Sequence, residues 1–192
     1  MTKHFSRPNC CRSRLVQDCI MAERYLPASE FLNYVLADEI TLDASVLGRA
    51  NLSTLLQMVD DPDRSNRDWA TFLISGLPFD SPEIRLALLR AADDADVDTR
   101  DEAIVGLARR DRAAAIERLK PLLKEEIGEV LLEAATILGD PSLVPALKEI
   151  EGWDGDGDAV RDQLRCALAA CEAGIGKDAT GDELVSLHRL SD

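Results

Sequence analysis

The sequence predicts an all-α protein: a right-handed α-solenoid of about four helix pairs with helical caps at its ends. Its composition supports this, because 46% of the 192 residues are hydrophobic but only 4% are aromatic, and leucine and alanine dominate. Such a composition favours packed helices over sheets. An acidic turn followed by an amphipathic helix also recurs several times along the chain, and a fixed period of about 30 residues is typical of solenoids.

The recurring motif is clearest in three segments. They are "DDPDRSNRDWATFLISGL" from Asp60, "DDADVDTRDEAIVGLARR" from Asp93 and "DGDGDAVRDQLRCALAAC" from Asp154. A weaker copy, "KEEIGEVLLEAATILGD", starts at Lys124. The position that follows each turn is separated from the next by 33, 31 and 30 residues, and it holds Arg67, Arg100, Leu131 and Arg161.

Two further positions of the motif are apolar in every copy. Three residues after the turn position stand Ala70, Ala103, Ala134 and Leu164, and seven residues after it stand Ile74, Leu107, Leu138 and Leu168. The i, i+3, i+7 spacing places these side chains on one face of a helix. We therefore expect them to form the core of the array.

A second short amphipathic helix precedes each acidic turn. These segments are "LSTLLQMV", "PEIRLALLRAA", "AAAIERLKPLLK" and "PSLVPALKEI". The repeating unit is thus a helix, an acidic turn and a second helix. One such pair cannot bury its apolar face alone, so neighbouring pairs must stack to make a continuous core.

The pattern D-D-x-D-x-x-x-R-D-x-A-x-x-x-L resembles HEAT repeats, especially the short bacterial phycobilisome-lyase HEAT-like repeats, over about residues 51–172. The resemblance implies a ladder of contacts between turn aspartates and helix arginines of neighbouring repeats. Arg67, Arg100 and Arg161 match this ladder, whereas Leu131 departs from it. The resemblance also implies that the second helices line the concave side.

Three regions are expected on this basis. Residues 1–50 form an N-terminal helical cap, with a degenerate repeat inside it as an alternative, because the ends of a repeat array need a different cover. Residues 51–172 form the array. Residues 173–192 form a linker, "GIGKDATG", and a short C-terminal helix, "ELVSLHRL", behind a capping-box pattern from Thr180 to Glu183. That helix either docks on the array or binds a partner.

The charge distribution bears on partners. The net charge is −14, and residues 1–50 contain six basic and six acidic groups, so the array and C-terminus carry the whole excess. An acidic body repels phosphate backbones, which argues against nucleic acid and suits a basic protein partner. No long apolar run predicts a membrane span or secretory signal, and five cysteines without a framework spacing fit reduced thiols in the cytoplasm. The oligomeric state is left open.

The stretch "DGDGD" from Asp154 raises the possibility of a calcium loop. An EF-hand starting there would need Gly at position six and Glu at position twelve, but the chain has Ala159 and Arg165. Because it occupies the place of the other acidic turns, we interpret it as an inter-helix turn, with a weak adventitious Ca²⁺ site as the alternative.

The sequence offers no pattern for catalysis, for a cofactor or for a resident metal. The histidines, His4 and His188, stand near opposite ends of the chain, and the spacing of His4 with Cys10, Cys11 and Cys19 matches no zinc motif. Cys166 and Cys171 are expected to act as small buried hydrophobes on the last repeat helix.

The expected function is therefore a non-catalytic protein–protein interaction module: a scaffold, an adaptor, or an inhibitor or immunity-type binder of a basic partner. The resemblance leaves a bilin lyase or chaperone-like enzyme as the alternative. Positions two, five and nine after each turn arginine share one helix face, which is the candidate partner-binding surface. Its members are Trp69, Phe72, Glu102, Val105, Arg109, Glu133, Thr136 and Gln163, continued by Cys166. For Trp69 and Phe72 the alternative is burial beneath the N-terminal cap.

Overall fold

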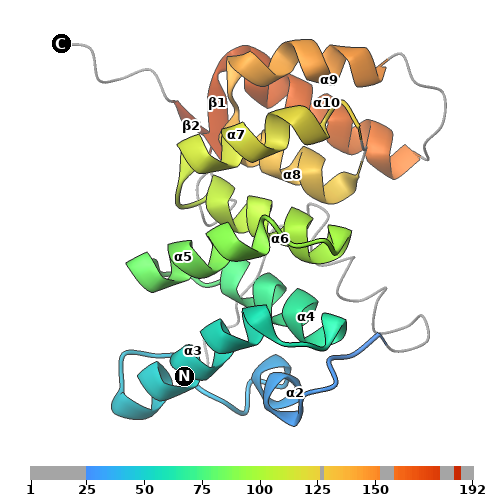
Figure 1. Cartoon of the computed structure of the whole chain (residues 1–192). Coiled ribbons are helices and arrows are strands. Elements are labelled where there is room, and N and C mark those ends of the chain that lie inside the picture. Colours follow the sequence, from blue (N-terminus) through green and yellow to red (C-terminus); the bar gives the residue numbers. More distant parts are fainter. Residues whose placement is uncertain (1–24, 126–127, 152–157, 178–183, 187–192) are drawn as a thin grey trace.

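Figure 1 shows the chain as a stack of helix pairs in a computed structural model that describes residues 25–125, 128–151, 158–177 and 184–186. A short helix, α2 (Glu30–Leu36), precedes the stack. The first helices of the pairs are α3 (Val46–Gln57), α5 (Pro82–Ala91), α7 (Arg112–Leu122) and α9 (Val144–Glu151). The second helices are α4 (Arg64–Ser75), α6 (Val97–Ala108), α8 (Glu129–Leu138) and α10 (Asp158–Ala173). Single 3-10 turns, η1 (Met58–Asp60) and η2 (Pro141–Leu143), lie next to α3 and α9.

The second helices pack on one another in chain order, α4 on α6, α6 on α8 and α8 on α10. The all-α solenoid predicted from the sequence is therefore confirmed. So is the predicted core face: the two apolar positions of the motif are 0% exposed in the first three repeats, and Leu164 and Leu168 of the last are 6% and 7% exposed. Leu131, which replaces the turn arginine, is also fully buried.

The aspartates of the acidic turns are explained by capping of the helices that follow. Each second helix begins with backbone N–H groups that lack an intrahelical partner, and a preceding carboxylate can accept from them. Asp63 accepts a hydrogen bond from the Ser65 N–H, and Asp96 accepts one from the Thr99 N–H. Asp63 and Asp96 are thus the helix caps of these two turns.

The C-terminus of α4 is capped by a side chain of the next pair. The guanidinium of Arg110, which follows α6, donates to the carbonyl oxygens of Leu77 at 2.6 Å and Ser75 at 3.1 Å. Its side chain is 4% exposed, and Asp80 lies 3.7 Å from it. Carbonyl groups at a helix end need such donors, so this arginine stabilises the junction between the first two pairs.

Two features of the predicted domain plan are corrected. The boundary at residues 50 and 51 falls inside α3, which begins at Val46 behind the cap residue Ser45. The predicted C-terminal helix is wrong for Leu184–Ser186, which form strand β2 paired antiparallel with β1 (Ile175–Lys177) in the register Ile175 to Ser186. The rest of that expected helix lies outside the described residues. A short apolar run can form either a helix or a strand, and here the edge of β1 provides backbone hydrogen-bond partners for a strand.

The strand β1 lies directly against the end of α8. Gly139 adopts a left-handed conformation with φ of +53°, and a Cβ atom built there would lie 2.3 Å from the Ile175 carbonyl carbon and oxygen. Gly176 in turn approaches the Ile137 carbonyl oxygen so closely that a Cβ atom would lie 2.3 Å from it. Both positions therefore require glycine.

We expect Gly139→Ala to lower the free energy of unfolding by about 1–3 kcal/mol, because alanine strains a left-handed residue and meets the backbone of β1. Gly76→Ala is the matched control. Gly76 ends α4 with φ of −83°, and its added Cβ would make only ordinary contacts at 3.6 Å. Chemical denaturation of both variants tests this, and equal stability of the two would contradict the close approach.

Candidate functional site

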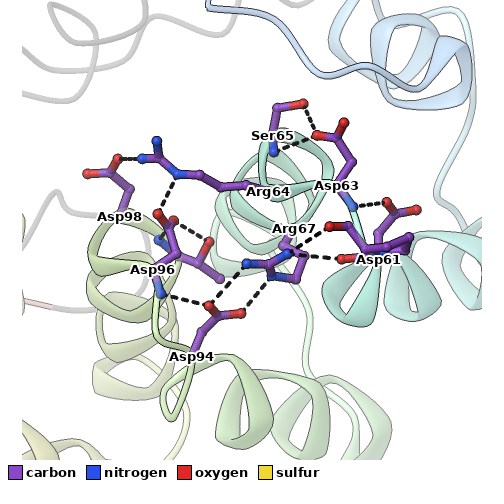
Figure 2. Close-up of polar contacts among 10 residues, drawn as sticks. Asp61, Asp63, Arg64, Ser65, Arg67, Asp94, Asp96 and Asp98 are labelled. Atoms are coloured by element: carbon purple, nitrogen blue, oxygen red, sulfur yellow. Dashed lines mark hydrogen bonds and ion pairs between the residues drawn. The ribbon is translucent and has the colours of Figure 1, made fainter.

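Figure 2 shows a polar network that joins the turns of the first two repeats. The Arg67 guanidinium donates through Nε to Asp94 of the next turn at 2.8 Å, and through Nη1 to the carbonyl oxygen of Asp61 in its own turn at 3.1 Å. Both partners of the ion pair are mostly buried, with 21% and 14% of their side chains exposed. The inter-repeat contact expected for Arg67 is thus present.

The two turns that Arg67 joins have the same internal geometry. The carboxylate of Asp61 accepts from the Asp63 N–H at 2.8 Å, and that of Asp94 accepts from the Asp96 N–H at 2.8 Å. Such Asx turns fix the chain direction just before a helix. Each turn therefore presents its carboxylates in the same orientation from one repeat to the next.

Asp96 and Asp94 each accept three hydrogen bonds in this network. Asp96 accepts from the Thr99 N–H at 3.0 Å, from the Thr99 hydroxyl at 2.8 Å and from the Arg64 guanidinium. Burial by itself would raise the pKa of Asp96, but the bonds from Thr99 and Arg64 outweigh it and hold that pKa below the usual value. Arg64 also donates to Asp98, so it links the start of α4 to the start of α6.

Of the three ladder arginines, only Arg67 has its own turn and the next turn both fully within the described residues. Arg100 lies close to Asp101, with 3.2 Å between Nη2 and the carboxylate, but part of the turn that follows it, Glu126 and Ile127, is outside the described residues. Arg161 is exposed on α10 and follows a turn that is outside them as well. The contacts predicted for these two arginines therefore stay predictions.

Arginines of the first helices also reach the turn carboxylates. Arg90 of α5 pairs with Asp60 at 2.9 Å, and Arg118 of α7 pairs with Asp93 at 3.2 Å. These carboxylates nevertheless remain open to solvent, with 56% and 67% of the Asp60 and Asp93 side chains exposed. An exposed carboxylate can meet a partner, so these residues are functional candidates that the helix-face argument missed.

The predicted partner-binding face lies mostly in the seam between successive second helices. Val105 is 0%, Thr136 2% and Gln163 6% exposed, so these three are wrong as surface contacts. The reason is the stacking itself: Val105 and Thr136, at position five, face the next second helix, and Gln163, at position two of α10, meets Thr136 at 3.5 Å. Cys166, at position five of α10, is exposed, contrary to the burial expected for it. Cys171 is buried as expected. Glu102 and Phe72 are half-buried, and Arg109 pairs with Glu133 at 2.9 Å between α6 and α8.

Trp69 is buried and does not lie on the surface, in agreement with the alternative interpretation that the N-terminal region covers it. It is 7% exposed, because the Tyr25 ring stacks on it with ring centroids 6.3 Å apart, and Phe72 meets its edge at 5.6 Å. Tyr25 belongs to an extended segment, residues 25–29, that precedes α2 and that we call the strap. The strap is held on α4 by hydrogen bonds from the Ala28 N–H to the Ser65 hydroxyl and from the Ser29 N–H to the Asn66 side-chain oxygen, at 3.1 and 2.8 Å.

Two further expectations concern metals and membranes. Among the described residues, no three side chains of the metal-ligating types converge. The "DGDGD" turn proposed as an alternative Ca²⁺ site lies outside the described residues up to position 157. Across the described part of the chain, no helix has the length and apolar character needed to cross a bilayer.

We expect Arg67→Leu to reduce the free energy of unfolding by roughly 0.5–2 kcal/mol, because a partly buried charge-assisted bond is lost. The third repeat shows that leucine fits at this position, since Leu131 occupies it without exposure. Arg90→Leu is the control, because it removes an exposed ion pair of the same type, which contributes little. Denaturant titration should separate the two variants; equal midpoints would remove the ladder as a stabilising contact.

Trp69→Ala should cost about 3–5 kcal/mol of stability, as for other buried aromatic residues. Thermal and urea unfolding measure this loss directly. A variant that unfolds like the parent protein would mean that Trp69 is a surface residue after all.

Comparison with known proteins agrees with this geometry. Residues 52–138 match the model of the family described as HEAT repeats. Protein YibA of Escherichia coli strain K12 is 32% identical over 100 residues, which cover 52% of this chain and 36% of YibA, and the YibA of Escherichia coli O157:H7 gives the same values.

The X-ray structure of Escherichia coli YibA has the same fold, with a TM-score of 0.53 and 24% identity over 80% of this chain and 58% of that one. The chain thus spans less than two thirds of the length of YibA in each comparison. The likeness to HEAT repeats is thus shown for residues 52–138, which include the stacked helix pairs from α4 to α8 and the turn-to-helix contact of Arg67.

Proposed function

We propose that this protein is a non-catalytic interaction module that binds a basic protein partner, as an inhibitor or immunity-type binder does. A HEAT repeat array presents an extended surface made of equivalent positions, which suits it to hold a protein ligand. The partner contacts the turns between the helices, and not the buried contact between successive second helices.

The observation that carries the proposal is the repetition of carboxylates along one edge of the array, of which Asp60, Asp93 and Asp98 are the most exposed. We call this edge the turn edge and define its acidic members among the described residues as Asp60, Asp61, Asp63, Asp93, Asp94, Asp96 and Asp98. Four arginines contact it, namely Arg64, Arg67, Arg90 and Arg118. Seven negative and four positive charges leave an excess of −3 on these residues.

Helices α5 and α7 do not share this acidic excess. Besides Arg90 and Arg118, which contact the turn edge, they carry three basic side chains and two acidic ones: Arg85, Arg112 and Lys120 against Glu83 and Glu117. The acidic character therefore belongs to particular parts of the array. A localised field of one sign steers a partner of the opposite sign and orients its approach.

The exposure of the turn-edge carboxylates fits a role in the initial electrostatic encounter with the partner. Asp98 has 60% of its side chain exposed, close to the values for Asp60 and Asp93. Charges at such positions gain little from their own surface ion pairs, so a partner's lysines and arginines can compete for them at low cost. The bilin lyase alternative has no comparable support among the described residues.

The experiment begins with purification of the tagged protein from its native cells and identification of its bound partner by mass spectrometry. Association of the purified pair is then measured by surface plasmon resonance at several salt concentrations. We expect Asp60→Lys with Asp93→Lys to slow association about tenfold at low salt and to flatten its salt dependence, because steering depends on charge.

The matched control is Glu39→Lys with Glu149→Lys, two exposed residues outside the turn edge. It makes the same change in net charge elsewhere on the protein, and we expect less than a twofold effect. Equal slowing by both double variants would show that only total charge matters, and no slowing by either would remove the turn edge from the interface.

A further inference from the structure

The strap is fastened to α4 at its two ends by different chemistry. Near Ser29 the fastening is neutral, through the backbone hydrogen bonds to Ser65 and Asn66, and Asn66 is only 7% exposed. At Tyr25 it is aromatic and ionic: the ring stacks on Trp69, the Arg64 guanidinium lies 5.9 Å from the ring centre, and the hydroxyl hydrogen-bonds to the carboxylate of Asp68. The second end therefore depends on the charge of Asp68.

Asp68 stands among groups from three parts of the chain. Tyr25 of the strap contacts it, Arg64 lies one turn before it on α4, and Asp98 of α6 and the α6 cap residue Asp96 face it. Among the described residues, the positive group that acts on Asp68 is Arg64, and it is already engaged by Asp96 and Asp98. An ionised Asp68 is thus a third carboxylate near one guanidinium, partly removed from water by the strap.

We propose that the strap is a pH-responsive cover of the Trp69 side of α4, held most firmly when Asp68 is protonated and released more readily when Asp68 is ionised. Opening of the strap returns water to the Asp68 carboxylate and removes the Tyr25 ring from Trp69. Arg64, Asp96 and Asp98 also belong to the turn edge or contact it, but opening of the strap is measured on the protein alone, without the partner proposed above.

The direction of the pH effect on docking of the strap follows from proton linkage. Burial raises the pKa of Asp68 from 3.8 to about 6; Asp98 and Asp96 add to the rise, whereas the Tyr25 hydroxyl and Arg64 oppose it. Burial and Asp68 also raise the pKa of Tyr25, so its hydroxyl remains a donor near neutral pH. If hydration restores the ordinary pKa of Asp68 in the open state, docking is strongest below pH 3.8, weakens up to about pH 6 and is level above it.

Hydrogen exchange of the Ala28 and Ser29 amides reports this opening, since α4 side chains accept from both. Protection factors, corrected for the intrinsic exchange rate, are measured by NMR at pH 5 and pH 7.5. The linkage predicts about a tenfold lower protection at pH 7.5. Both histidines, His4 and His188, are replaced by glutamine in every protein compared, because imidazole titrates in the same range.

Asp68→Asn is the decisive variant, because it keeps the shape of the side chain and removes its titration. We expect its Ala28 and Ser29 protection to change less than twofold between the two pH values. No loss of protection in the parent protein would overturn the proposal, and so would an equal loss in Asp68→Asn.

Tyr25→Phe gives a second test that keeps the ring on Trp69. Without the hydroxyl donor the ionised carboxylate is less stable under the strap, so the pKa of Asp68 should rise further and the pH effect should exceed that of the parent. An unchanged ratio of protection factors would contradict the role of the Tyr25–Asp68 bond. The amide of the buried residue Leu132, which bonds to the carbonyl of the cap residue Gly128 in the first turn of α8, serves as the internal reference for global unfolding.

Discussion

Each second helix of this protein has an apolar side that remains uncovered until the neighbouring pair stacks on it, and this requirement shapes the rest of the structure. Helices α4, α6, α8 and α10 satisfy it by packing on one another in order. Small residues allow the close approach: Gly106 of α6 leaves so little room that an added Cβ would lie 2.7 Å from Leu88 and 3.0 Å from Ser75. A stack of this kind has continuous seams, and side chains in the seams are unavailable to partners.

Stacking also explains the arrangement of charge. Helices that are aligned in register bring their N-terminal turns to one edge, and each turn needs carboxylates to cap the helix that follows. Asp61 and Asp94 then lie in adjacent repeats with Arg67 between them, which couples neighbouring pairs through a partly buried ion pair. The same need for caps gathers more carboxylates at the edge than arginines neutralise. A feature required for folding thus produces the acidic surface on which the proposed function depends.

The strap shows a different use of the same chemistry. It covers α4 at residues that the later repeats do not share, since Trp69 and Asn66 of α4 correspond to Glu102 and Thr99 in the next repeat. The substitution of aromatic and amide groups at these positions gives α4 a surface that can hold an extended segment. Asp68 lies beneath that segment, so protein folding and proton binding are coupled at this place.

The sequence by itself determined the repeat, its period of 30–33 residues and the core positions, because these depend on apolar spacing within the helix that recurs in every copy. The contact of Arg67 with the next turn was implied only by the resemblance to HEAT repeats, since the equivalent position of the third copy is Leu131. Ala70, Ala103 and Ala134 could be assigned to the core from their spacing alone. Only the tertiary structure decided which helix face is exposed: Val105 and Thr136 share the helical face of the half-exposed Glu102 but lie in the seam, since their burial depends on how adjacent helices are rotated. It also decided that Leu184–Ser186 pair as a strand with β1 and that Tyr25 covers Trp69, because both contacts join segments distant in sequence, where no local pattern specifies the partner.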